Sequence, residues 1–338
     1  MFGASAPARP EAIRASATPS GSRSEARPTF AMGKDIPQAG GWGLGGPIGC
    51  LLQPSLTKSE LHEYGSGLPE LPEIESIVRM ARPQVVGRTI ATCRVIHPIV
   101  VQPERPKRFS ERLVGRPVQA VDRRGKYILF RLDSLTLVFH LKLDGQFLRI
   151  PSHPPAGAHL DVLFEFEDGT SLAFVEPRHL GRARIVPSHE LDRFLPPLGP
   201  DPLHSSFTAE ALDRGLEASR AAVKTWLMDQ KRIAGLGNIY TAEALFRAGI
   251  RPTRRARTLT PGEVRRLHKT IVDTLQAALE CFGDSPPDWT QVGWWFPELD
   301  KLACVYGREG QPCRCCRGRI RALKQAGRTS FYCPGCQR

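Results

Sequence analysis

The stretch YILFRLDSLTLVFHLKL (127–143) indicates the fold class, because it holds two runs in which apolar, β-branched and aromatic residues dominate. Similar runs lie on both sides of it, and turns such as EDGT (167–170) separate them. Several runs alternate apolar and polar residues, which predicts an antiparallel sandwich or barrel. The segments expected to be strands are 89–96, 127–132, 135–143, 161–167 and 171–176.

Helical patterns flank these runs. Upstream, residues 73–82 are expected to form a helix that ends near Pro83. Downstream of LPPLGPDPL (195–203), Thr208 is expected to cap a helix, and Thr260 with Glu263 resembles a capping box. The helices expected in this second region lie near 208–217, 220–229, 240–248 and 261–281.

Residues 1–67 differ from the rest of the chain. They are rich in Ala, Pro, Ser and Gly, and they show no sustained apolar periodicity. We therefore expect them to be disordered, or to be no part of the working protein. An organelle transit peptide is the alternative that four early arginines suggest, and Glu11 and Glu25 argue against it.

The charge of the chain indicates a polyanionic partner. The formal net charge is +13 over 338 residues, which suits binding to nucleic acid or to an anionic membrane, unless the protein is simply soluble and basic. Between Lys301 and Arg338, nine Lys or Arg residues and one acid, Glu309, leave +8. This concentration favours a phosphate-binding module. A membrane partner is not expected, because no apolar run reaches the roughly 18 residues that a membrane span needs.

Four of the nine cysteines form the frame C-x2-C-x16-C-x2-C. No secretory signal is recognisable, so a reducing cytosol is expected, where paired cysteines indicate a metal more than disulfides. Two tight pairs at this separation can close a tetrahedron of thiolates around one structural Zn²⁺, with no open position for catalysis. Cys315, which lies inside the frame, is interpreted as a bystander. The expected ligands are Cys313, Cys316, Cys333 and Cys336.

The segment GLGNIY (235–240) lies between two expected helices. Gly235 and Gly237 allow tight backbone turns, and the N–H groups that follow Asn238 open a helix. The N-terminus of a helix is a ready anion site. The motif indicates a phosphate-binding turn only together with the other motifs of the chain, because glycine-rich helix connections are common.

Several motifs in a fixed order resemble the formamidopyrimidine-DNA glycosylases of the Fpg/Nei group over roughly residues 68–338. The motifs are LPELPEIESI (68–77), RRGKYILF (123–130), HLKLDGQ (140–146), EPRHLG (176–181), LGPDPL (198–203), DQKRIAGLGNIYTAEALFRAGIRP (229–252) and VYGREGQPC (305–313). The resemblance implies an α+β multidomain protein: a catalytic β-sandwich at 68–195, a helix–two-turn–helix domain at 196–300 and a zinc ribbon at 301–338. It also implies a monomer with double-stranded DNA between its domains, in the cytoplasm at the nucleoid.

The nucleophile of this family is the amine of an N-terminal proline, which matches Pro69. An internal proline nitrogen is an amide and cannot form an imine, whereas a free α-amino group titrates near pH 8 and is partly neutral at pH 7. A secondary amine can attack the sugar carbon that bears the base and form a cationic Schiff base. We therefore expect that synthesis starts at Leu68, encoded as an initiator by a non-standard codon and then removed. Proteolysis or an inactive protein are the alternatives.

The resemblance assigns further roles around the nucleophile. Glu70 matches the general acid that protonates the ribose ring oxygen, and Glu73 either assists it or only complements the dipole of its helix. Lys126 matches the lysine that contacts the phosphate near the lesion and serves beta-elimination. Arg328 matches the arginine of delta-elimination, and Asn238 matches an asparagine that grips a phosphate.

Other positions match DNA contacts less closely. A flipped base leaves a hole that side chains must fill. The family places Met, Arg and Phe there, and the matching residues are Leu143, Arg178 and Leu180, of which both leucines depart from the pattern and would otherwise be core residues. Arg220 matches a basic DNA contact. A histidine of the family corresponds to Gly157, and His159 is nearby.

The preferred lesion is the least determined feature. Residues 281–305 depart from the family segment that caps 8-oxoguanine and contain Trp289, Trp294 and Trp295 instead. Oxidised purines are the first expectation, and oxidised pyrimidines, as for endonuclease VIII, are the second. A non-catalytic damage-binding protein and an RNA-binding zinc protein are alternatives from other classes.

Overall fold

The computed structural model describes residues 69–143, 145–150, 160–282 and 302–338. Residues 1–67, His159 and the three tryptophans between 289 and 295 lie outside this description. In chain order the elements are α1 (Leu71–Val85), β1 (Ile90–Val95), η1 (Pro98–Val100), α2 (Pro106–Glu111), β2 (Ala120–Arg124), β3 (Tyr127–Arg131), β4 (Leu135–His140), β5 (Gln146–Ile150), β6 (Leu160–Phe166), β7 (Ser171–Val175), β8 (Arg182–Pro187), η2 (Ser188–Glu190), α3 (Leu191–Phe194), α4 (Ala209–Glu217), α5 (Val223–Leu227), α6 (Asn238–Arg247), η3 (Ala256–Thr258), α7 (Pro261–Phe282), β9 (Arg321–Gln325) and β10 (Arg328–Tyr332).

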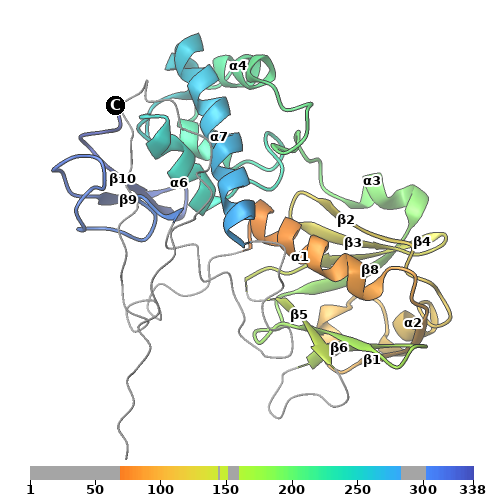
Figure 1. The fold of residues 1–338 in the computed structure, drawn as a ribbon. Helices are drawn as coiled ribbons and strands as arrows, with labels where there is room; N and C mark the ends of the chain where they lie inside the picture. Colours follow the sequence, from red (N-terminus) through yellow and green to blue (C-terminus); the bar gives the residue numbers. More distant parts are fainter. Residues whose placement is uncertain (1–68, 144, 151–159, 283–301) are drawn as a thin grey trace, which may run out of the picture. The chain divides into compact units, whose positions relative to one another are not determined.

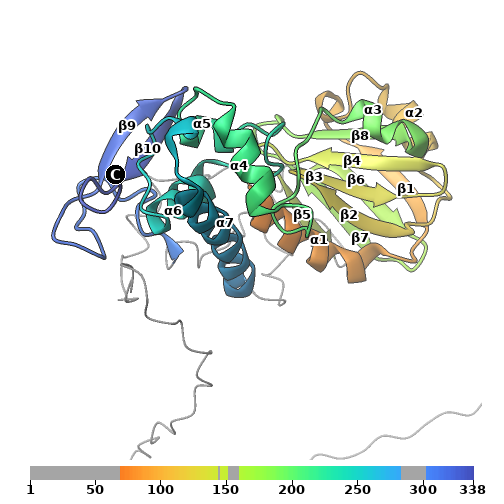
Figure 2. The same cartoon turned by 90° about the horizontal axis from the view of Figure 1, so that it is seen from above.

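Two antiparallel sheets form a sandwich, as the alternating runs predicted. Their strand orders are β1-β6-β7-β5 and β2-β3-β4-β8, and Figures 1 and 2 show them as facing layers. Phenylalanines from both sheets meet in the core. The ring of Phe139 on β4 lies 5.0 Å from Phe147 on β5 and 5.4 Å from Phe174 on β7, between ring centroids. These contacts join the two sheets through apolar burial.

All five segments expected to be strands contain one, but β2, β5 and β8 were not predicted. In β5 the polar Gln146 is buried together with Phe147 and Leu148, so the alternation that marks a strand is missing. In β8 the arginines at 182 and 184 alternate with the buried Ala183 and Ile185 over only four residues, and this short pattern was not recognised. Arg182 donates to the carbonyl oxygens of the loop before it, and Arg184 donates to the carbonyl oxygen of Val100.

The first helix is longer than predicted, and the expected end near Pro83 is wrong. Helix α1 continues to Val85, and the Val86 N–H donates to the Arg82 carbonyl oxygen at 3.0 Å. A proline inside a helix removes one backbone hydrogen bond. Val85 is fully buried in the sandwich core, and this burial offsets the loss.

The helical region follows the prediction except at α5. Both predicted caps are present: the Ala211 N–H donates to Thr208 Oγ1 at 3.2 Å, and the Glu263 N–H donates to Thr260 Oγ1 at 3.3 Å. The helix expected near 220–229 is present but shorter than predicted, because α5 covers only Val223–Leu227. The residues before it pair with 254–257 instead, so that the backbone is extended there.

The cysteine-rich end of the chain packs on α6 (Figure 1). Glu243 of α6 is buried, and its carboxylate accepts the backbone N–H groups of Cys304, Val305 and Tyr306, each at 2.9 Å. Arg247 pairs with the same carboxylate at 2.8 Å. Among the described helices, none combines the length and the apolarity that crossing a bilayer requires.

Candidate active site and metal centre

The start of the described chain packs directly on the loop before α6. The Leu71 N–H donates to the Gly235 carbonyl oxygen at 3.0 Å, and Pro69 is buried. A Cβ atom on Gly237 would lie 2.3 Å from Glu70 Cδ and 2.6 Å from Lys126 Nζ. Only glycine allows this approach, so the GLGNIY motif is needed for close packing as well as for the turn.

The N-terminus of α6 holds a carboxylate of the protein itself. Glu70 accepts the Ile239 N–H at Oε1, 2.9 Å, and the Tyr240 N–H at Oε2, 3.4 Å. Both donors belong to the first turn of α6, where the helix dipole favours a negative charge. The sequence predicted an anion site at this turn, and in this structure Glu70 supplies the anion. The side-chain amide of Asn238 donates to the Thr329 carbonyl oxygen at 3.2 Å, and its phosphate contact stays a prediction.

Glu73 makes two specific hydrogen bonds in addition to lying in the first turn of α1. Its Oε2 accepts the Glu70 N–H at 2.9 Å, and its Oε1 accepts the hydroxyl of Tyr240 on α6. Burial raises the pKa of Glu73 to about 7, and the nearby charge of Glu70 adds to the rise. Glu70 and Glu73 therefore form a carboxylate pair that joins α1 to α6.

Lys126 lies near both acids of this pair and Lys224 lies near Glu70, and the charge of Arg328 acts on both lysines. Burial lowers the pKa of Lys126, against the raising effect of Glu70 and Glu73, and the charge of Arg328 lowers it further. Lys224, which follows Val223 in α5 and is buried, was not predicted from the sequence. Its Nζ donates to the Thr329 carbonyl oxygen and to Ser330 Oγ, and burial lowers its pKa to about 8. Lys224 and the exposed Arg328 line one hollow of about 120 Å³.

The side chains expected to fill the hole of a flipped base lie in loops. Leu180 is 42% exposed in the loop between β7 and β8, so it is no core leucine. Arg178 in the same loop and Arg220 before α5 are exposed, and Leu143 after β4 is partly buried. These positions are accessible to a ligand, and their DNA contacts stay predictions.

Four thiols gather at the end of the chain. The Sγ atoms of Cys313, Cys316, Cys333 and Cys336 all lie within 4.8 Å of one another and could hold a metal ion. Cys315 is not among them, as expected. The Gly318 N–H donates to Cys316 Sγ at 3.3 Å, as in a turn whose amides stabilise a thiolate.

Comparison with known proteins shows which family has this sequence and fold. Residues 68–183 match the family model described as the formamidopyrimidine-DNA glycosylase N-terminal domain, and residues 198–286 match the H2TH domain of the same enzymes. A formamidopyrimidine-DNA glycosylase of Geobacillus kaustophilus is 37% identical over 274 residues, 80% of this chain and 100% of the relative. One of a Ruegeria species is 39% identical over 284 residues, with the same shares of the two chains.

The chain belongs to the formamidopyrimidine-DNA glycosylase family. It is therefore a DNA glycosylase, an enzyme of DNA repair. Among solved structures, the chain is similar to a point mutant of the Lactococcus lactis Fpg in complex with a Fapy-dG containing DNA. The TM-score is 0.73 at 30% identity, over 80% of this chain and 100% of that one.

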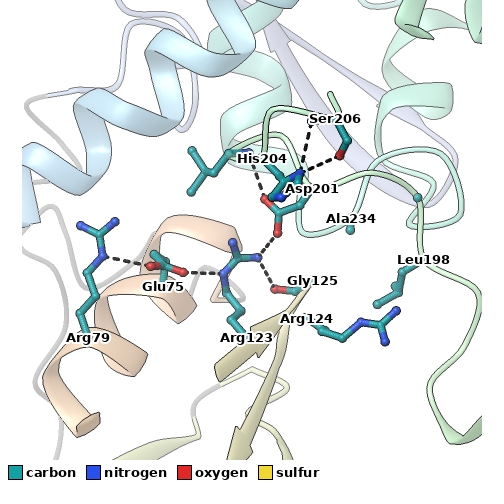
Figure 3. Close-up of a pocket in the computed structure, with 12 residues that line it drawn as sticks. Glu75, Arg79, Arg123, Arg124, Gly125, Leu198, Asp201, His204, Ser206 and Ala234 are labelled. Atoms are coloured by element: carbon teal, nitrogen blue, oxygen red, sulfur yellow. Dashed lines mark hydrogen bonds and ion pairs between the residues drawn. The ribbon is translucent and has the colours of Figure 1, made fainter. Parts of the chain in front are cut away.

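In this glycosylase an ion-paired joint links α1, the end of β2 and Asp201 (Figure 3). Arg123, just before the β2–β3 turn, pairs with Glu75 of α1 at 2.8 Å and with Asp201 at 2.7 Å. Burial alone would raise the pKa of Glu75, but Arg123 and Arg79 outweigh it and the pKa is lowered. A pocket of about 480 Å³ opens here, and each of its arginines already has an acidic partner. We interpret the pocket as part of this joint.

Replacing Gly237 by alanine tests the close packing of Glu70 against the α6 loop. The added Cβ must displace the Glu70 carboxylate or Lys126, so we expect Gly237→Ala to lower the free energy of unfolding by about 1–3 kcal/mol. Urea denaturation measures the change. Gly262→Ala is the matched control, because a Cβ there meets nothing within 4 Å. Equal stability of Gly237→Ala and the native chain would contradict the packing.

Replacing Glu73 by glutamine tests its raised pKa. The folded state keeps the proton between the unfolded pKa of 4.5 and about 7, so the native chain loses stability as pH rises through this window. The shift corresponds to about 3 kcal/mol. Glu73→Gln mimics the protonated acid, so its unfolding free energy, from urea denaturation at pH 5 and pH 8, should lack this fall. Glu217→Gln, an exposed change on α4, should keep it. Parallel pH profiles for Glu73→Gln and the native chain would disprove the shift.

Proposed function

We propose that the protein is a bifunctional DNA glycosylase and AP lyase that removes oxidised purines from double-stranded DNA, as a monomer in the cytoplasm at the nucleoid. The observation that carries the proposal is the position of Pro69, buried at the point where Glu70 caps α6 and Lys126 approaches Gly237. The similar Lactococcus lactis Fpg has been solved with a Fapy-dG containing DNA and with an oxidised pyrimidine containing DNA, so the first choice of purines rests on the family resemblance. Oxidised pyrimidines are the second candidate, because the capping segment carries tryptophans.

The proposed chemistry needs Pro69 as a free secondary amine. Its lone pair attacks the sugar carbon that bears the damaged base, the base leaves, and a cationic Schiff base forms. Glu70 protonates the ribose ring oxygen so that the sugar opens. The iminium then acts as an electron sink for beta- and delta-elimination, which breaks the bonds to both flanking phosphates. We propose that Lys126 serves the first elimination and Arg328 the second.

The remaining proposed roles concern the duplex. Asn238 and Arg220 grip the backbone, and phosphate contacts of this kind position DNA without reading its sequence. Leu143, Arg178 and Leu180 fill the space that the extruded nucleotide leaves, in which leucine acts as an apolar wedge. His159 is a weaker candidate for a contact near the lesion.

Borohydride trapping on an 8-oxoguanine duplex tests the nucleophile. We expect a covalent adduct with a chain that begins at Pro69, because borohydride reduces the imine that its amine forms. The matched control begins at Leu68 and differs by one residue that converts the amine to an amide. The control and the 338-residue chain should give no adduct, and a duplex with an oxidised pyrimidine should trap more slowly.

The other hypotheses predict different results. No adduct from the Pro69 chain, with binding to the lesion retained, would indicate a non-catalytic damage-binding protein. Equal binding to undamaged DNA and RNA would favour an RNA-binding zinc protein. Sequencing of the N-terminus from native cells tests the proposed start, and a mature protein with residue 68 attached would contradict the enzymatic mechanism.

We propose that the four-cysteine centre holds one structural Zn²⁺. Around a tetrahedral zinc with Zn–S bonds of about 2.3 Å, sulfur atoms lie about 3.8 Å apart. The pairs Cys313–Cys336 and Cys316–Cys333 are separated by 3.8 Å and 3.5 Å between Sγ atoms, so these two pairs are close to the spacing that zinc needs. When bound, the zinc would supply rigidity to the hairpin that carries Arg328.

Metal content after single substitutions tests this centre. We expect about one zinc per native chain, and Cys316→Ser should lose it because three thiolates bind zinc far more weakly than four. Zinc is measured by atomic absorption after dialysis. Cys315→Ser is the matched control and should keep the metal. Loss of zinc from Cys315→Ser would instead make Cys315 a ligand.

A further inference from the structure

A second group of potential metal ligands lies in the sandwich, apart from the cysteine centre. His97 follows β1, Asp161 belongs to β6, and His179 lies in the loop between β7 and β8. Each offers one ligand atom, and the three atoms all lie within 4.8 Å of one another. The imidazole rings of His97 and His179 are 4.2 Å apart between centroids. Three segments that are distant in sequence thus bring two imidazoles to one carboxylate.

The carboxylate at the centre of this group is fixed in place. The side chain of Asp161 is fully buried; its Oδ2 accepts the Glu176 N–H, and its Oδ1 lies 2.7 Å from His179 Nδ1. The Asp161 carbonyl oxygen accepts the His97 N–H at 3.2 Å. The site therefore needs no folding step to assemble, apart from the orientation of two partly exposed rings.

The backbone at His179 is shaped to turn its ring inward. His179 has φ of 53°, in the left-handed region that residues other than glycine rarely occupy. Its neighbours Arg178 and Leu180 are exposed, whereas His179 faces the buried Asp161. A hydrogen-bonded Glu176 carboxylate, which accepts the N–H groups of Leu180 and Gly181, supports this turn. Such strain marks sites where a particular side-chain position is needed.

We propose that His97, Asp161 and His179 bind one divalent transition-metal ion of the zinc class. Two imidazole nitrogens and one carboxylate oxygen suit Zn²⁺, Co²⁺ or Ni²⁺, whereas Mg²⁺ and Ca²⁺ prefer oxygen ligands alone. Ligands at about 2.0–2.1 Å from a tetrahedral zinc lie about 3.3 Å apart. The 2.7 Å between His179 Nδ1 and Asp161 Oδ1 must widen by roughly 0.6 Å, which a small rotation of the half-exposed ring achieves.

An ion bound at this site would restrain the loop between β7 and β8. His179 lies between Arg178 and Leu180, the residues that the proposed function places in the duplex. A bound ion would add a direct link between the side chains of His97 and His179, which without it are joined to Asp161 separately, through its carbonyl oxygen and its carboxylate. The binding of the ion itself does not rest on the proposed function, because it requires no DNA and no catalysis.

Calorimetric titration of the full chain with Zn²⁺ tests the proposal, after the cysteine centre has been loaded. We expect one further equivalent to bind to the native chain. His97→Ala and His97→Gln should each weaken this binding by at least about tenfold, and unchanged urea midpoints show that both variants fold. His189→Ala, a change at an exposed histidine of η2, should bind as the native chain does.

The spectrum of bound cobalt locates the second ion. Co²⁺ at two imidazoles and a carboxylate should show ligand-field absorption without the thiolate-to-cobalt charge-transfer bands of a cysteine site. The proposal is overturned if the loaded native chain takes up no second equivalent, or if His97→Ala and His97→Gln bind it as tightly as the native chain. Because no DNA is present, this result is independent of trapping at Pro69.

Discussion

The hydrogen bonds from the first turn of α6 to the Glu70 carboxylate are the constraint on which the candidate site depends. They join residues 169 and 170 positions apart and hold the start of α1 against the helical region. The Leu71 bond to Gly235 and the Tyr240 bond to Glu73 repeat the connection on either side. A buried carboxylate without such donors would cost several kcal/mol, so the helix N-terminus determines where this acid can lie.

The same arrangement separates the properties of the two acids. Two like charges about 4 Å apart repel by about 4 kcal/mol at an effective dielectric constant of 20. Glu70 faces the N-terminus of α6 and the nearby Lys126, whereas Glu73 receives only neutral donors and retains a proton up to about pH 7. While Glu73 keeps its proton, it places no second negative charge beside Glu70. Lys224 and Arg328 complete the charge balance from the helical region and the terminal hairpin.

Local patterns predicted the elements, but not the contacts between them. Alternation predicted five of the eight sandwich strands, and capping chemistry predicted where α4 and α7 begin. The spacing of the cysteines identified the thiol cluster, because its geometry is almost wholly local. Lys224 could not be recognised from its neighbours, since its burial depends on Thr329 and Ser330, more than 100 residues away. The strand β5 was missed for a related reason, because the burial of Gln146 follows from tertiary contacts.

Among the described residues, the contacts that fix the chain next to Pro69 come from residues that follow it. Glu70 is fixed by Ile239, Tyr240 and Glu73, and Leu71 is fixed by Gly235. Removal of the residues before Pro69 leaves each of these contacts intact. The fold and the proposed chemistry therefore place different demands on the same position. The fold needs Glu70 and Leu71 packed on the α6 loop, whereas the proposed imine needs a proline nitrogen with no acyl group. An upstream residue can abolish the reaction without disturbing the scaffold that would carry it.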